Sequence, residues 1–126
     1  MDNCKTIDIE DAIQAALNAE GIKAAAPPVP ANLSPCVYVY RTGGNSQNYV
    51  QDTHLVSFDC YAHTEAEAME QADELTKWVR YIVGRDLLTP VYASELVTLP
   101  YNNPDPSHPT LPRATFLAQI TTRVAH

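Results

Sequence analysis

Residues 99–113 (LPYNNPDPSHPTLPR) hold five of the chain's ten prolines, and an alternating segment follows at once. Proline lacks a backbone donor and fixes φ, so neither an ordinary helix nor a central strand fits this stretch. The asparagines and the aspartate between the prolines favour turns. We therefore predict a long, stiffened loop. Because most connections are shorter than about 12 residues, a loop of this length indicates a functional or partner-binding segment.

The composition limits the size and the partners of the protein. With 126 residues, 45% of them hydrophobic, the chain is predicted to form a single domain, 1–126, with a substantial core. Fifteen acidic residues against eight basic ones give a formal charge of −7, and the basic residues are scattered along the chain. Without a basic stripe to neutralise phosphates, tight nucleic-acid binding is not expected.

Cysteine usage and hydropathy indicate the compartment. The three cysteines form no CxxC pair, so we expect a reduced, cytosolic protein in which Cys36 and Cys60 act as small apolar residues. The first residues carry acids and no apolar signal-peptide core, and no apolar run reaches the ~18 residues of a membrane span. We expect a soluble protein that does not enter a membrane.

An amphipathic helix is predicted over residues 7–20. Apolar residues recur there at helical spacing, acids lie in the first turn, and Gly21 follows as a C-terminal cap. Residues 22–26 form a weak strand that Pro27 and Pro28 end. The apolar stripe of the helix comprises Ile9, Ala12, Ile13, Ala16 and Leu17.

Two strands are predicted next, over residues 36–41 and 53–62. The first is rich in aromatic and β-branched residues and ends at a turn signal, Gly43, Gly44 and Asn45. We expect an antiparallel pair joined by a flexible tip of about ten residues. The second strand alternates, with Val56, Phe58 and Cys60 on one face and Thr53, Ser57 and Asp59 on the other.

The strongest helix signal runs from Thr64 to about residue 83. Thr64 and Glu67 form a capping box, acids precede bases along the segment, and Gly84 stops it. Asp73 and Lys77 are spaced for an ion pair, and Trp78 and Tyr81 are assigned to the margin of the core. The core stripe comprises Ala68, Ala72, Leu75, Val79 and Ile82.

Two further strands complete the predicted order. Residues 91–99 form one strand, the proline-rich loop follows, and residues 114–124 form the last, with Phe116, Ala118, Ile120 and Val124 on one face. The elements predict an α+β fold, in which a mostly antiparallel or mixed sheet of four to five strands carries two main helices on one face.

No residue pattern predicts catalysis or a metal centre. Asp59 and His63 form the closest suggestive pair, but their spacing matches no metal site, and His54 lies in phase with the apolar face, as a satisfied or edge histidine does. No GxSxG motif occurs, and residues 43–45 lack the glycine spacing of a phosphate loop. We expect neither an enzyme, nor a cofactor, nor a metal.

Three segments together resemble a family of viral assembly proteins. They are the strand-to-helix run VSFDCYAHTEAEAMEQADELTKWV, the strand after it, and the long loop that ends LPRATFLAQITTRV. Over about residues 36–124, their order resembles the tail terminator, or tail completion, proteins of long-tailed bacteriophages and prophages. The density of prolines in the loop and the weakly marked first strand depart from the family pattern.

The resemblance implies a structural virion protein without catalysis. Such a protein forms a ring, usually a homohexamer, on the head-proximal end of the tail, stops polymerisation of the tail tube and offers its other face to neck or connector proteins of the head. It is assembled in the host cytoplasm, and DNA passes its lumen without specific binding. Six copies at −7 carry −42 in total, which suits such a lumen.

We place the subunit and tube contacts on two predicted loops, 42–52 and 101–113. A rigid sheet holds loops in position, and proline lowers the ordering cost of binding. In this interpretation Arg113 pairs with a carboxylate of a neighbouring subunit. The candidate interface residues are Gly43, Gly44, Asn45, Tyr101, Asp105, His108 and Arg113.

Three alternative functions stay open from the sequence. The first is another head–tail neck component, such as a head-closure or connector protein. The second is a small ligand-binding regulatory domain of ferredoxin-like layout, since two helices on one antiparallel sheet also suit that role. The third is a small metal-dependent hydrolase.

Overall fold

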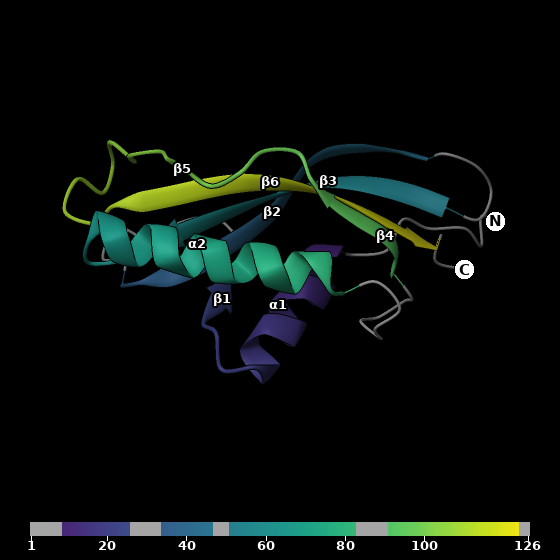
Figure 1. The fold of residues 1–126 in the computed structure, drawn as a ribbon, viewed down its shortest axis with the longest axis horizontal. Helices are drawn as coiled ribbons and strands as arrows, with labels where there is room; N and C mark the ends of the chain where they lie inside the picture. The colour runs from purple at the N-terminus through teal and green to yellow at the C-terminus, as the bar shows by residue number, and fades with distance from the viewer. Residues whose placement is uncertain (1–8, 26–33, 47–50, 83–90, 124–126) are drawn as a thin grey trace.

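The computed structural model describes residues 9–25, 34–46, 51–82 and 91–123 (Figure 1). Cys4, Pro27, Pro28, Gly84 and Val124, on which some of the predictions fall, lie outside these ranges. The elements are α1 (Ile9–Ala19), β1 (Ala24–Ala25), β2 (Cys36–Ser46), β3 (Gln51–Tyr61), α2 (Glu65–Arg80), β4 (Val91–Leu96), β5 (Tyr101–Asn102) and β6 (Arg113–Arg123).

The strands form one mixed sheet. Its order is β1-β2-β3-β6-β4, and β5 pairs with β6 next to the stretch that β4 occupies. β1 and β2 are parallel, and the other pairs are antiparallel. The predicted α+β fold is confirmed. The sheet has six strands instead of four to five because the proline-rich loop contributes β5, a strand of two residues.

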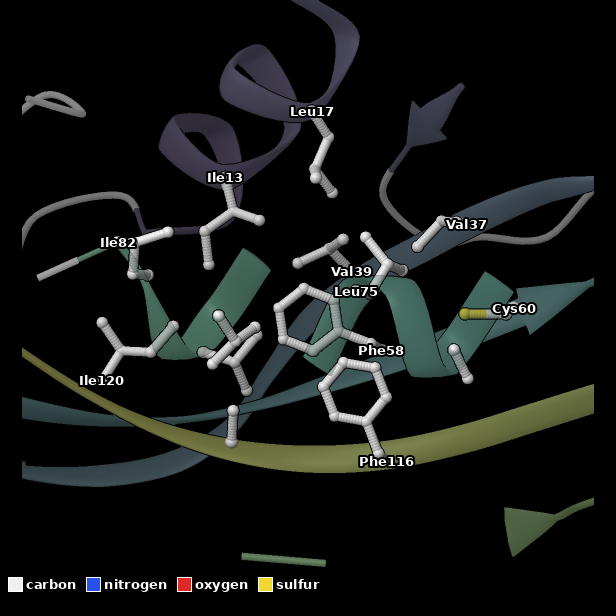
Figure 2. Close-up of a cluster of buried hydrophobic side chains, with 14 of the residues drawn as sticks. Ile13, Leu17, Val37, Val39, Phe58, Cys60, Leu75, Ile82, Phe116 and Ile120 are labelled. Carbon is white, nitrogen blue, oxygen red and sulfur yellow. The ribbon is translucent and has the colours of Figure 1, made fainter. Parts of the chain in front are cut away.

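Both helices cover the same face of the sheet. In Figure 1, α2 lies along the sheet and α1 crosses below it, and Figure 2 shows their side chains meeting those of β2, β3 and β6. The predicted alternation is confirmed, because Phe58 and Phe116 are fully buried cross-strand partners whose rings stack 4.7 Å apart. The other face of the sheet carries no helix among the described residues.

The end of α1 follows its predicted cap. Gly21 has a φ of 84°, which glycine adopts without a Cβ penalty. Its N–H donates to the carbonyl of Asn18, and Ile22 N donates to Leu17 O at 3.0 Å, which together form a Schellman motif. Of the predicted stripe, Ile9, Ala12, Ile13 and Leu17 are buried and Ala16 is half-buried.

Helix α2 begins as predicted and ends earlier. Thr64 Oγ1 accepts a hydrogen bond from Glu67 N at 3.1 Å, and the five residues of the predicted core stripe are fully buried. The helix stops at Arg80 with Tyr81 as its C-cap, so the predicted end near residue 83 is wrong. Tyr81 is 69% exposed, so its assignment to the core margin is also wrong, while Trp78 packs against the core.

The ion pair predicted between Asp73 and Lys77 on α2 is wrong, because Lys77 pairs with Glu74. Lys77 lies 3.5 Å from Glu74, one turn back, and both side chains are exposed. Asp73 instead offers its backbone carbonyl to the hydroxyl of Thr76. No helix among the described residues is long and apolar enough to cross a membrane.

The predicted flexible tip over 42–52 is replaced by strand at residues 42–46 and 51–52, and residues 47–50 lie outside the described residues. β2 continues to Ser46 and β3 begins at Gln51, and Gly43, Gly44 and Asn45 pair with the β3 residues opposite them. Gly43 has no positive φ, so it serves here as a strand residue and not as a turn residue. A register shift between Arg41 and Gly43 marks a bulge that absorbs one residue.

Candidate assembly surface

A polar cluster lies at one end of the sheet face that the helices leave uncovered. Asp59 and Tyr61 reach it from β3, and the strand register pairs Tyr61 with Arg113, the first residue of β6. Asp105 and His108 join them from the proline-rich loop. We refer to these five residues as the anchor cluster.

Arg113 lies at the centre of the anchor cluster. Its Nε donates to the carbonyl of Asn103 at 2.6 Å, and its Nη1 donates to the Tyr61 hydroxyl at 3.3 Å. The same Nη1 lies 3.8 Å from carboxylate oxygens of both Asp59 and Asp105, and the side chain is only 18% exposed. One guanidinium therefore joins the sheet to the loop through charge and hydrogen bonds.

Asp105 holds the loop from its own side. Its Oδ2 accepts from the Tyr61 hydroxyl at 2.8 Å and lies 2.9 Å from His108 Nδ1, which carries the proton because an ionised carboxylate only accepts. Its Oδ1 accepts from Ser107 N, which closes a tight turn. These hydrogen bonds, from His108 first and then from Tyr61, lower the pKa of Asp105 to about 2.

Asp59 is a buried carboxylate with several donors. It accepts from the hydroxyls of Thr115 at 2.9 Å and Tyr40 at 3.1 Å. Hydrogen bonds of this kind offset the desolvation of a buried charge. Burial, together with the hydrogen bond to Asp105, raises the pKa of Tyr61 to about 12, so its hydroxyl keeps its proton and remains a donor.

Large apolar side chains lie exposed at the edge of the sheet just before the anchor cluster. Val97 is 50% exposed, Leu99 67% and Tyr101 44%. We refer to these three residues as the exposed edge. They follow β4 and enter β5, and in Figure 1 this segment runs along β6 toward the end of the sheet where α2 begins.

Backbone hydrogen bonds hold the exposed edge against β6. The N–H groups of Val97 and Thr98 both donate to Leu117 O, and Thr98 Oγ1 accepts from Leu117 N at 3.0 Å. Farther along, Asn103 N donates to Arg113 O at 2.9 Å. The loop that the sequence predicts is therefore tied to the sheet on both sides of Tyr101.

The structure brings together some of the predicted interface residues and separates others. Asp105, His108 and Arg113 meet in the anchor cluster, and Tyr101 lies exposed in β5. The three residues of the predicted turn, 43–45, lie opposite residues 53–55 of β3, roughly 20 Å along the sheet from Tyr61 at about 3.3 Å per residue. Arg113 pairs with Asp59 and Asp105 of its own chain, whereas the sequence predicted a carboxylate of a neighbouring subunit.

Sequence reasoning missed Tyr61, Tyr40 and Asn103. It considered Asp59 only as a partner of His63 and as a residue on the polar side of its strand. The available signal was an acid on β3 and an arginine that begins β6. Joining the two requires the strand register, which periodicity alone does not supply. The prediction for His54 as a satisfied histidine is confirmed, because the side chain is buried with Nε2 3.0 Å from Thr122 Oγ1. His63 is exposed just before the α2 cap.

Other chemistry has little support in the described part of the chain. No group of three or more metal-ligating side chains occurs there. A hollow of about 270 Å³ between the end of α1 and the start of α2 falls just below the usual range of ligand clefts, roughly 300–1,000 Å³. It is lined partly by the exposed, charged side chains of Lys23 and Glu67.

No protein-family model and no curated protein sequence matches this chain.

Proposed function

We propose that this chain is a structural protein of a phage tail, which forms a ring on the head-proximal end of the tail tube and ends polymerisation of the tube. The observation that carries an assembly role is the exposed edge, held in place by β6 and the anchor cluster. Grouped apolar side chains on a surface favour contact with another protein. The resemblance over residues 36–124 supplies the kind of assembly.

The anchor cluster supports assembly better than catalysis. A catalytic group acts on a substrate placed within hydrogen-bond reach. Here Asp59, Asp105 and Arg113 direct their polar atoms at one another and at the loop backbone. Such a network holds a loop in one conformation before a partner arrives, which reduces the ordering cost of binding.

The proposal is tested by mixing the purified protein with tail tubes and imaging them by negative stain. We expect ring-shaped density at one end of each tube and a halt in tube elongation. A variant in which a short flexible linker replaces residues 105–110 loses the anchoring turn, so both effects weaken. The matched control is Arg80→Ala, which removes an exposed charge from α2 and should cap tubes like the wild type.

Two results oppose the proposal. A protein that never forms rings and never caps a tube overturns it. A protein that forms rings but binds only portal or head complexes belongs with the other neck components, and tail termination is then rejected. Unchanged ring formation and tube capping by the linker variant would remove residues 105–110 from the contact.

A further inference from the structure

The two edges of the sheet differ in what they present. At one edge, β4 and β5 pair with β6 and, in the part of the chain that the structure describes, with no other strand; this edge carries the exposed edge residues, with the exposed Glu95 beside them. At the opposite edge, β1 pairs with β2 and, within the described ranges, with no other strand. We refer to Ile22, Lys23, Ala24 and Ala25 as the β1 edge; Lys23 is exposed, and the three apolar residues are half-buried.

The rest of β2 near this edge is closed to strand pairing at one point. The N–H of Arg41, just beyond the stretch that β1 covers, donates to the carboxylate of Glu10 at 2.8 Å. A side chain that caps an edge amide prevents another strand from adding there. The Asn18 side chain likewise caps both the N–H and the C=O of Ala24, at 3.0 and 3.3 Å, so the β1 edge is closed to strand addition and can be contacted only through its side chains.

We infer that the exposed edge of one copy docks against the β1 edge of the next copy, so that subunits join head to tail. The inference rests on the proposed ring, because it names the contact between its subunits. Both surfaces are apolar at their centre, and their exposed charges are opposite, Glu95 on one and Lys23 on the other. Two unlike surfaces on one subunit generate a heterologous contact, which gives a ring when the rotation between successive copies closes and an open filament when it does not.

Charge also argues for a copy of this chain over a nucleic acid at the exposed edge. The edge carries no basic side chain, and the chain as a whole has a formal charge of −7. Copies with that charge repel one another, so their contact needs apolar area together with one of the few basic residues. The β1 edge supplies both.

The small area of the exposed edge limits how much of the contact between two copies it can form. Stable interfaces bury about 800 Å² on each partner, more than three partly exposed side chains provide. Val97, Leu99 and Tyr101 are therefore the centre of the contact, and the Glu95–Lys23 pair belongs to its polar rim. Truncation at the centre should have large effects, and charge reversal at the rim small ones.

The test measures self-association of the full chain without tail tubes, by native mass spectrometry and sedimentation over a wide concentration range. We expect oligomers of the wild type, and we expect Leu99→Asp to raise the concentration needed for assembly by at least about tenfold. Ala66→Asp introduces the same charge at an exposed position on α2 and should assemble like the wild type. Circular dichroism checks that each variant is folded.

A charge-swap pair tests the partner surface directly. Glu95→Lys and Lys23→Glu should each weaken assembly about threefold, and the double variant should restore it, because the rim pair re-forms in reverse. Glu70→Lys controls for the change in net charge. Failure of the double variant to recover overturns the head-to-tail contact.

The remaining outcomes separate this inference from the proposed function. Assembly of Leu99→Asp at the wild-type concentration, or a wild type that stays monomeric throughout, overturns the inference. Rings that depend on both edges yet never cap a tube leave the inference supported and overturn tail termination.

Discussion

Two segments that the sequence predicts as loops, 42–52 and 99–113, reach order by different means. Residues 42–46 and 51–52 of the first lie in β2 and β3, and the hydrogen bonds of the hairpin ladder hold these residues. The second keeps only the two residues of β5 as strand and depends on side chains, with Arg113 at the centre. Prolines account for the difference, because they remove the donors that a ladder needs.

The two modes of support predict different responses to mutation. A ladder spreads its stability over many backbone groups, so replacing one side chain changes little. A side-chain cluster concentrates stability in a few charged groups, and removal of one leaves its partners buried without compensation. We therefore expect single substitutions in the anchor cluster to destabilise the proline-rich loop more than single side-chain substitutions destabilise the hairpin of β2 and β3.

Arg113→Ala should produce the largest effect. It leaves the carboxylates of Asp59 and Asp105 without their shared cation and removes the donor to Asn103 O. We expect a loss of about 3 kcal/mol in the free energy of unfolding, measured by urea denaturation. Hydrogen exchange should accelerate at the amides of the loop and stay unchanged in β2.

Arg80→Ala is the matched control for this prediction. Arg80 is exposed on α2, and such substitutions change stability by less than about 0.5 kcal/mol. If Arg113→Ala were as stable as Arg80→Ala, the anchor cluster would not be what holds the loop.

Much of the fold was predictable because the spacing of apolar residues along a helix or strand indicates which of its side chains are buried. The stripe of α2, its Thr64 cap, and the pairing of β2 with β3 follow from patterns within single segments. The extension of β2 through Gly43 was not predictable, because a polar, glycine-containing stretch is stabilised there by its partner strand and not by its own propensity.

The site was predictable only in part. The prolines indicated the loop. Asp105, His108 and Arg113 were selected from it, but they were predicted to contact another chain and not one another. Their mutual contacts, and those with Tyr61, arise because β6 lies beside β3 in a register that no local pattern encodes. Of the exposed edge, Tyr101 was selected in advance and Leu99 lay in the predicted loop, but Val97 was assigned to a strand, and an alternating strand pattern does not tell an edge strand from an inner one.

Lowering the pH should destabilise the β2–β3 hairpin end and the proline-rich loop one after the other. Burial and the adjacent Arg41 lower the pKa of His54, near the far end of the hairpin. Arg41 Nη1 lies 3.4 Å from His54 Nδ1, and arginine only donates, so this nitrogen must be unprotonated. Because the folded pKa lies below the unfolded value of 6.5, the contribution of neutral His54 is complete above 6.5 and is lost as pH falls below it.

The anchor cluster should respond at lower pH. The pKa of Asp105 is about 2 in the folded protein against an ordinary value of 3.8, so its contribution to stability is present above pH 3.8 and is lost as the pH falls toward 2. Hydrogen exchange followed from pH 7 downward should therefore open the hairpin end before the loop. His54→Gln should abolish the first step and Asp105→Asn the second; a loop that opens first would contradict the assignment.

Paired glycine substitutions give the smallest expected effects, and they test whether 42–52 is strand or turn. A Cβ added at Gly43 meets no atom within 4 Å, and its φ is not positive, so Gly43→Val should stabilise the protein by about 0.5 kcal/mol through strand propensity and a less flexible unfolded chain. Gly21→Ala also has open space, but its φ of 84° strains any L side chain, so it should destabilise by about 1 kcal/mol. Opposite signs in thermal unfolding follow from backbone conformation alone. If both substitutions destabilised, Gly43 would occupy a turn, and the contrast between the ladder-held hairpin and the anchored loop would fail.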